Sequence, residues 1–151
     1  MKWNEVGVPR GIGLAISLIF TTTMPTQSRS QEYALVIDDI ERSARAIGLR
    51  PTYVDCIRGG ARTTPAMLDC ADLEFAFQDK RLNKTYGAVM SSLGDSERSA
   101  LRSEERKWLS LKAKKCALPD DPGSTDHVIA ADCDVTETAR RATLLEQRRP
   151  R

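Results

Sequence analysis

The chain has 151 residues, of which 23 are Lys or Arg and 21 are Asp or Glu, and its net charge at pH 7 is +2. This length suits one domain preceded by a processed leader. Residues 1–30 hold three of the basic residues and one of the acidic ones, so the remainder carries 20 charges of each sign. Nucleic-acid and membrane-surface partners normally require a cationic excess, and this balance argues against both.

A short apolar run near the N-terminus predicts a signal peptide over residues 1–30. Residues 11–20 are uncharged and mostly apolar, the right length for a signal h-region and too short to anchor the protein in a bilayer. Ser28 and Ser30 favour cleavage before Gln31, and no cysteine follows to carry a lipid. The alternative is an N-terminal core helix, but the run has no polar face. We therefore expect a periplasmic or secreted domain with no stable membrane anchor.

The first part of the exported chain is expected to be a helix and a linker, over residues 31–48. Apolar residues recur at helical spacing over 31–47, and Gly48 and Pro51 then end the helix. Residues 48–64 are expected to be irregular. Their Gly59–Gly60 pair is not followed by the Gly-Lys-Ser/Thr pattern of a phosphate-binding loop.

Three longer helices are expected in the main domain, residues 50–147. The first begins with Thr64 as N-cap and Pro65 at its first position, and runs to Leu93 before Gly94. Its apolar stripe is Leu68, Phe75, Leu82, Val89, Tyr86, Met90 and Leu93.

Ser96 is expected to cap the second of these helices, which runs to about Ala117 and ends before Pro119 and Pro122–Gly123. The third begins near Asp126 and ends in a basic tail at residues 148–151. The two apolar faces are Leu101, Trp108 and Leu111, and then Val128, Val135, Ala142 and Leu145. No segment alternates with the period of a strand, so the sequence predicts an all-α fold, a small antiparallel helical bundle with two disulfides.

Four cysteines follow the predicted cleavage site: Cys56, Cys70, Cys116 and Cys133. An even number in an exported chain indicates disulfides, with three pairings possible. A zinc site is disfavoured because the cysteines are scattered and His127 is the only histidine. Nearest-neighbour pairing, Cys56–Cys70 and Cys116–Cys133, pins a loop to a helix end in each case. Crossed pairing between helix ends is the alternative.

The sequence does not favour an enzyme, a metal site or a cofactor. Any nucleophile–base arrangement would have to use His127, which lies at a helix start in an acidic segment and is better explained as a capping or solvated residue. The carboxylates Asp69, Asp72, Glu74 and Asp79 fall on one helix, where solvated positions are the ordinary explanation. Asp79 is the exception, because it lies close to the apolar stripe. We expect it to be partly buried and paired with Lys112 or Arg106.

Charge is unevenly distributed in the second half of the chain. Residues 98–115 hold seven basic and two acidic residues, whereas residues 116–137 hold six acidic residues and no Lys or Arg. One explanation is that the two segments attract each other across the fold. The other is that the acidic stretch is a docking face for a cationic partner.

A longer pattern of residues points to a family. It comprises Asp55, Cys56, residues 63–67, Cys70, residues 79–86, Leu101, Arg102, Trp108, Cys116, Cys133, Thr138, Arg141, Ala142 and Leu145. This pattern resembles the LprI-type lysozyme-inhibitor family over about residues 50–146. The chain departs from the family at Glu105, where Gln is usual, and at Lys112–Ala113, where an Arg-Asp pair is usual. Pro122–Gly123 also replaces a usual Gly-Gly turn.

The resemblance implies an exported helical protein that binds a protein partner, lysozyme in some members. The matched residues Asp79, Leu82, Asn83, Tyr86, Leu101 and Trp108 are interpreted as a structural motif. For the partner contact, the sequence favours the acidic residues Asp120, Asp121 and Asp126, because lysozymes are often cationic. The alternative function is an immunity or periplasmic interaction protein for another exported enzyme or envelope component.

Overall fold

The computed structural model describes residue 38 and residues 41–148. Its elements are α2 (Pro51–Asp55), the π-helical turn η1 (Cys56–Gly60), α3 (Thr64–Ser92), α4 (Asp95–Lys115) and α5 (Ser124–Gln147). The described residues contain helices and no strand, which confirms the all-α prediction. The predicted signal peptide, most of the helix predicted over residues 31–47, and residues 149–151 of the basic tail lie outside these residues.

A tight turn at Gly48 connects the N-terminal segment to the main domain. Residues 41–46 are helical, and Gly48 ends the helix with φ of +79°. The Gly48 and Leu49 amides donate to the carbonyls of Arg45 and Ala44, each at 3.0 Å, which is the Schellman arrangement. A side chain at Gly48 would be strained in this backbone conformation and would also collide with Arg81.

The prediction that residues 48–64 are irregular was wrong. Pro51 opens α2, because its fixed φ suits a first helical turn and its missing N–H would have had no helical partner. The chain then continues through η1 up to Ala61. Pro51 therefore prevents the preceding helix from continuing and also begins the next helix.

The long helix α3 begins one residue earlier than predicted. Thr63, not Thr64, is the N-cap, and its hydroxyl accepts from the amide of Ala66 at 3.4 Å. The helix passes through Gly87 and ends at Ser92, with Gly94 just beyond, as the sequence indicated.

The cap of α4 also differs from the predicted Ser96, and α5 begins at Ser124, two residues before the predicted Asp126. Each helix begins after a glycine, and a carboxylate in its first turn accepts from that glycine's amide. Glu97 accepts from Gly94 at 3.1 Å, and Asp126 accepts from Gly123 at 2.8 Å. Ser96 is therefore a first-turn residue rather than the cap. α4 ends at Lys115, and Cys116 follows as its C-cap.

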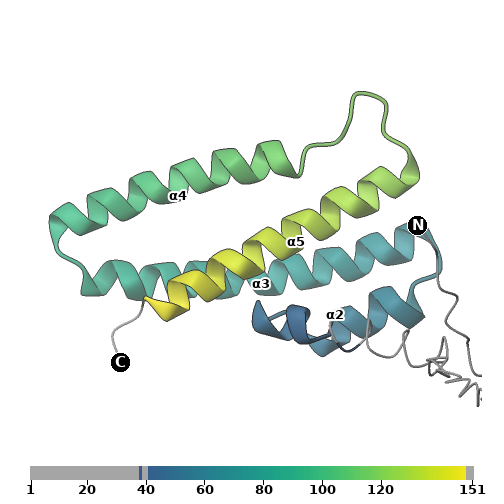
Figure 1. The fold of residues 1–151 in the computed structure, drawn as a ribbon, viewed down its shortest axis with the longest axis horizontal. Coiled ribbons are helices and arrows are strands. Elements are labelled where there is room, and N and C mark those ends of the chain that lie inside the picture. The colour runs from purple at the N-terminus through teal and green to yellow at the C-terminus, as the bar shows by residue number, and fades with distance from the viewer. Residues whose placement is uncertain (1–37, 39–40, 149–151) are drawn as a thin grey trace, which may run out of the picture.

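The three long helices form an antiparallel up-down-up bundle (Figure 1). α3 and α5 run in the same direction and pack along each other. α4, which lies between them in the sequence, runs in the opposite direction. α4 has a few backbone contacts with α5 and hardly any with α3. The loop between α4 and α5 arches away from the bundle (Figure 1). The bundle is therefore a tight helix pair with a third helix lying partly apart from it.

The core follows the predicted stripes on α5 better than those on α3 and α4. Val135, Ala142 and Leu145 are fully buried on α5. Val135 belongs to a core cluster with Cys70 and Ala71, whereas Ala142 and Leu145 cluster with Leu82, Val89 and Leu101. Leu111 is exposed, and Phe75 lies at 36% exposure, so these two predicted core positions were wrong. The buried seam of α3 instead contains Glu74, Gln78 and Thr85. Glu74 and Gln78 can be buried there because they meet hydrogen-bonding partners rather than an apolar surface.

Glu74 is the centre of this polar seam. Its carboxylate is fully buried and accepts from the backbone amide of Arg50 at 3.1 Å, from Arg50 Nε at 2.6 Å and from Gln78 Nε2 at 2.7 Å. Gln78 also donates to the carbonyl of Gly48 at 2.7 Å and accepts from Arg81 at 2.9 Å. The network fastens the turn before α2 to the middle of α3.

Two disulfides confirm the nearest-neighbour pairing. Cys56 is joined to Cys70, which connects η1 to the first turns of α3. Cys116 is joined to Cys133, which connects the end of α4 to α5 across the intervening loop. Tyr53 strengthens the same end of the molecule by donating to Asp132 at 2.7 Å. Burial, together with this hydrogen bond, raises the pKa of Tyr53 well above its usual range.

Candidate functional site

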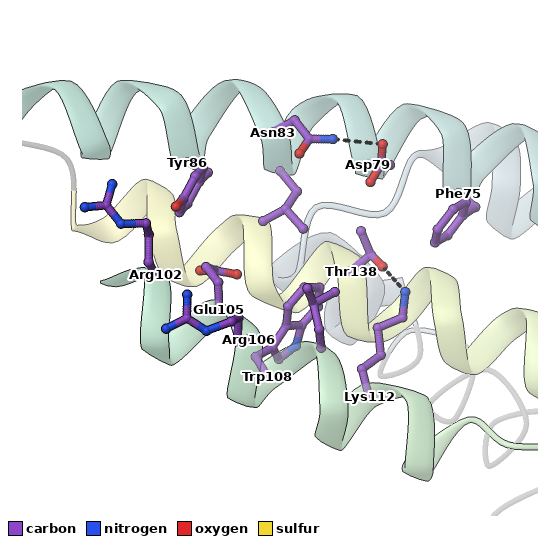
Figure 2. A pocket seen from close by; sticks show the side chains of 12 residues that line it. Phe75, Asp79, Asn83, Tyr86, Arg102, Glu105, Arg106, Trp108, Lys112 and Thr138 are labelled. Atoms are coloured by element: carbon purple, nitrogen blue, oxygen red, sulfur yellow. Dashed lines mark hydrogen bonds between the residues drawn. The ribbon is translucent and has the colours of Figure 1, made fainter. Parts of the chain in front are cut away.

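A groove lies where α4 separates from α3, and it has a volume of about 430 Å³ (Figure 2). This volume falls within the range of small-ligand sites. Residues of α3 and α4 form its two walls, and Thr138 of α5 lies between them. The lining residues are Phe75, Asp79, Leu82, Asn83, Tyr86, Arg102, Glu105, Arg106, Trp108, Leu109, Lys112 and Thr138.

The groove gathers five of the six residues that the sequence assigned to a structural motif: Asp79, Leu82, Asn83, Tyr86 and Trp108. Leu82 is buried in the core, and Tyr86 and Trp108 pack against that core from the groove side. Leu101, the sixth, is buried and serves the core alone. Asp79 and Asn83 are exposed, so core packing does not explain them.

The expected burial of Asp79 and its pairing with Lys112 or Arg106 were wrong. Asp79 is exposed, and Asn83, one turn further along α3, donates to it at 2.9 Å (Figure 2). Each side chain then keeps hydrogen-bonding capacity for a ligand, because an amide and a carboxylate each offer more than the one bond they share. The pair is a short polar edge on the α3 wall.

Lys112 closes one end of the groove. Its ammonium donates to Thr138 at 3.0 Å and pairs with Asp134 at 3.2 Å. The same nitrogen lies 4.8 Å from the centre of the Phe75 ring and 5.8 Å from that of Trp108. These contacts are within the range of a cation–π attraction, so Lys112 holds the two aromatic side chains in place.

A cluster of charged residues joins α5 to the α4 wall of the groove. Arg141 is buried, pairs with Glu104 at 2.9 Å and with Glu105, and lies 5.9 Å from the Trp108 ring centre. Arg148 pairs with Glu104 at 2.8 Å. The Arg148 guanidinium, assisted by Arg141, lowers the pKa of Glu104 to about 2.

Two arginines on the groove's α4 side take no part in the ion pairs found between described residues. Arg102 and Arg106 are exposed, and neither has an acidic partner among the described residues. They are spaced one helical turn apart and therefore lie on the same face of α4. The sequence placed Arg102 in the family pattern and named Arg106 as a partner for Asp79, but it assigned neither to a binding site, because both fall within a generally basic run.

The α4–α5 loop is the second candidate surface. Residues 117–121, which include Asp120 and Asp121, are all exposed, and Leu118 is 42% exposed. The disulfide at Cys116 fixes the beginning of the loop, and the cap at Gly123 fixes its end. Asp126 has a structural role in that cap, so only Asp120 and Asp121 remain as solvated carboxylates of the loop.

The opposite charges of the two halves also attract each other, as one of the two explanations predicted. Lys112 pairs with Asp134, and Lys115 pairs with Glu137 at 2.8 Å. The loop's own carboxylates do not take part in the ion pairs found among the described residues. Attraction across the fold therefore accounts for the carboxylates of Asp134 and Glu137 in the middle of α5, and it does not account for those of the loop.

Other site types find no support in the part of the chain that the structure describes. It holds no cluster of three or more His, Cys, Asp or Glu side chains suited to a metal ion. None of its helices is long and apolar enough to span a membrane. His127 is exposed in the first turn of α5.

Comparison with known proteins identifies one family. No curated protein and no solved structure matches the chain. The family model described as lysozyme inhibitor LprI matches residues 56–145. The match extends from the first disulfide to the last turns of α5 and so includes both the groove and the α4–α5 loop. The chain therefore belongs to the LprI family of lysozyme inhibitors.

Proposed function

We propose that this protein inhibits lysozyme by occluding the lysozyme cleft with its α4–α5 loop. The observation that carries the proposal is the exposed loop of residues 117–121, which is held at both ends by a disulfide and a helix cap. A loop whose two ends are already fixed loses less conformational entropy when it enters a cleft. This favours the loop over the flatter outer faces of the helices.

Charge supports the same assignment. Asp120 and Asp121 are solvated carboxylates at the tip of the loop, while the remainder of the exported chain is expected to be near neutral. Lysozymes are often cationic, so these carboxylates would speed the encounter and fix the orientation of the loop. The half-exposed Leu118 would supply the apolar contact.

Removing the charge of the loop tests this contact. The variant Asp120→Asn with Asp121→Asn should inhibit lysis of bacterial cell walls about tenfold less well, mainly because association slows, as expected for charges at an interface rim. Because salt screens such charges, the difference should shrink as ionic strength rises. Asp126 is kept, since its carboxylate caps α5.

The matched control is Asp55→Asn with Asp95→Asn, which removes the same charge at exposed positions outside the loop, on α2 and at the start of α4. This variant should inhibit as the natural protein does. Equal inhibition by both variants would show that the loop carboxylates are not the contact. If the natural protein in stoichiometric excess leaves lysis unchanged, the partner is not the lysozyme used.

A further inference from the structure

We propose that the α3–α4 groove binds a short, uncharged chain of N-acetylated amino sugars. This inference does not depend on lysozyme inhibition, because it uses a different surface and needs no second protein. It rests on the chemistry of the groove's residues: aromatic faces, a paired amide and carboxylate on one wall, and unpaired guanidinium groups on the other.

The aromatic side chains provide the surface for the sugar rings. Tyr86 and Trp108 reach into the space between the helices from opposite walls, and Phe75 lies further along (Figure 2). The faces of aromatic rings carry partial negative charge, which attracts the polarised C–H groups on one side of a pyranose ring. Lys112 lies 4.8 Å from the Phe75 ring centre and 5.8 Å from that of Trp108, so both rings are held before a ligand arrives.

The polar side chains match the acetamido group. The paired Asp79 and Asn83 can accept from a sugar hydroxyl or from an acetamido N–H. Arg102 and Arg106 on the facing wall have guanidinium groups free to donate to a hydroxyl or to the acetyl carbonyl. The acetyl methyl group would contact the apolar surface of Leu82 and Tyr86.

The charge pattern favours an uncharged glycan over an acidic helix of a partner protein. The unpaired Arg102 and Arg106 would attract such a helix, but Asp79 on the opposite wall would repel it. A neutral polyhydroxyl ligand can hydrogen-bond to all three side chains without that repulsion. Its rings would lie on the aromatic and apolar side chains between the two polar edges.

Trp108 reports on binding directly. The full-length, disulfide-bonded protein with Trp3→Phe has a single tryptophan. Titration with tri-N-acetylchitotriose should give a saturable change in its fluorescence, whereas maltotriose, which lacks acetamido groups, should give none. Asn83→Ala and Arg102→Ala remove exposed side chains that the fold does not need. Each should weaken binding about tenfold, the loss expected for one hydrogen bond to or near a charged group.

The controls are Lys84→Ala and Lys107→Ala, which remove exposed cations next to these positions but outside the groove. Both should bind within about twofold of the natural protein. No saturable change up to about 10 mM trisaccharide would overturn the proposal. Unchanged binding by Asn83→Ala and Arg102→Ala would overturn it too, since the sugar would then bind elsewhere. If the natural protein binds no sugar, and Asn83→Ala and Arg102→Ala lose lysozyme inhibition, the groove is a contact surface for a protein instead. None of these results alters the test of the α4–α5 loop.

Discussion

Replacing Glu74 with alanine should lower the free energy of unfolding by about 3 kcal/mol, as expected when one partner of a buried ion pair is removed. The Glu74 carboxylate is fully buried and accepts hydrogen bonds from the amide and Nε of Arg50 and from Gln78. Alanine would leave these donors without their acceptor. The Arg50 side chain is 36% exposed and can partly hydrogen-bond to water instead. The loss of unfolding free energy should therefore lie near the lower end of the range known for broken buried ion pairs. Denaturation by guanidinium chloride, followed by circular dichroism, measures it.

Two further variants separate the network from the helix itself. Glu74→Gln keeps the shape and one acceptor oxygen, but it removes the charge and replaces the other oxygen with an NH2 donor. It should therefore cost about 1–2 kcal/mol, less than alanine. Asp72→Ala changes an exposed acidic residue of the same helix and should stay within about 0.5 kcal/mol of the natural protein. A Glu74→Ala variant as stable as Asp72→Ala would contradict the role given to this network.

Removing the disulfide at the α4–α5 loop should weaken both stability and inhibition. Cys116 and Cys133 are 17 residues apart, and loss of their bond through Cys116→Ala with Cys133→Ala should cost about 3 kcal/mol in the chain-entropy account. The loop would also lose its fixed beginning and would have to be ordered upon binding. We expect about tenfold weaker inhibition of lysozyme for that reason.

The other disulfide provides the control for this experiment. Cys56 and Cys70 are 14 residues apart, so Cys56→Ala with Cys70→Ala should cost a similar free energy of unfolding. This disulfide joins η1 to α3, away from the loop sequence. Its removal should leave lysozyme inhibition unchanged at a temperature where both double variants are folded. Equal loss of inhibition in both variants would mean that general stability, rather than the shape of the loop, governs binding.

The sequence was sufficient for the features set by chain breakers and cysteines. Gly48, Gly94 and Pro122–Gly123 divided the helices correctly, because the backbone preferences of glycine and proline do not depend on distant contacts. Nearest-neighbour disulfides followed from the expected order of helices and loops. The family pattern was also correctly recognised.

Features that depend on tertiary partners were not predictable in the same way. Glu74 and Gln78 are buried only because Arg50 and the carbonyl of Gly48 reach them from a distant segment, and a hydrophobic pattern counts such residues as solvated. Phe75 and Leu111 were predicted core positions, but α4 lies apart from α3, so Leu111 is 56% exposed and Phe75 36% exposed.

The groove could have been suspected from the polar members of the family pattern. Asp79 and Asn83 are one turn apart on the helix, next to Tyr86, and neither residue type stabilises an apolar core. That signal was attributed to structure because the pattern does not indicate how far α4 lies from α3. The distance between two helices is decided by the side chains of both and by the loop that joins them.

Occlusion of the lysozyme cleft is tested most directly with a small soluble substrate. Hydrolysis of a chromogenic chitooligosaccharide and lysis of a cell wall use the same pair of carboxyl groups in the lysozyme cleft. An inhibitor that occupies the cleft should therefore block both reactions. The Asn83→Ala variant should be used alongside the natural protein, because sugar bound in the groove could otherwise deplete the substrate. We expect hydrolysis to fall in proportion to added protein and to stop near equimolar inhibitor, equally for both proteins. Undiminished hydrolysis of the soluble substrate at molar excess, whatever the effect on cell walls, would contradict cleft occlusion.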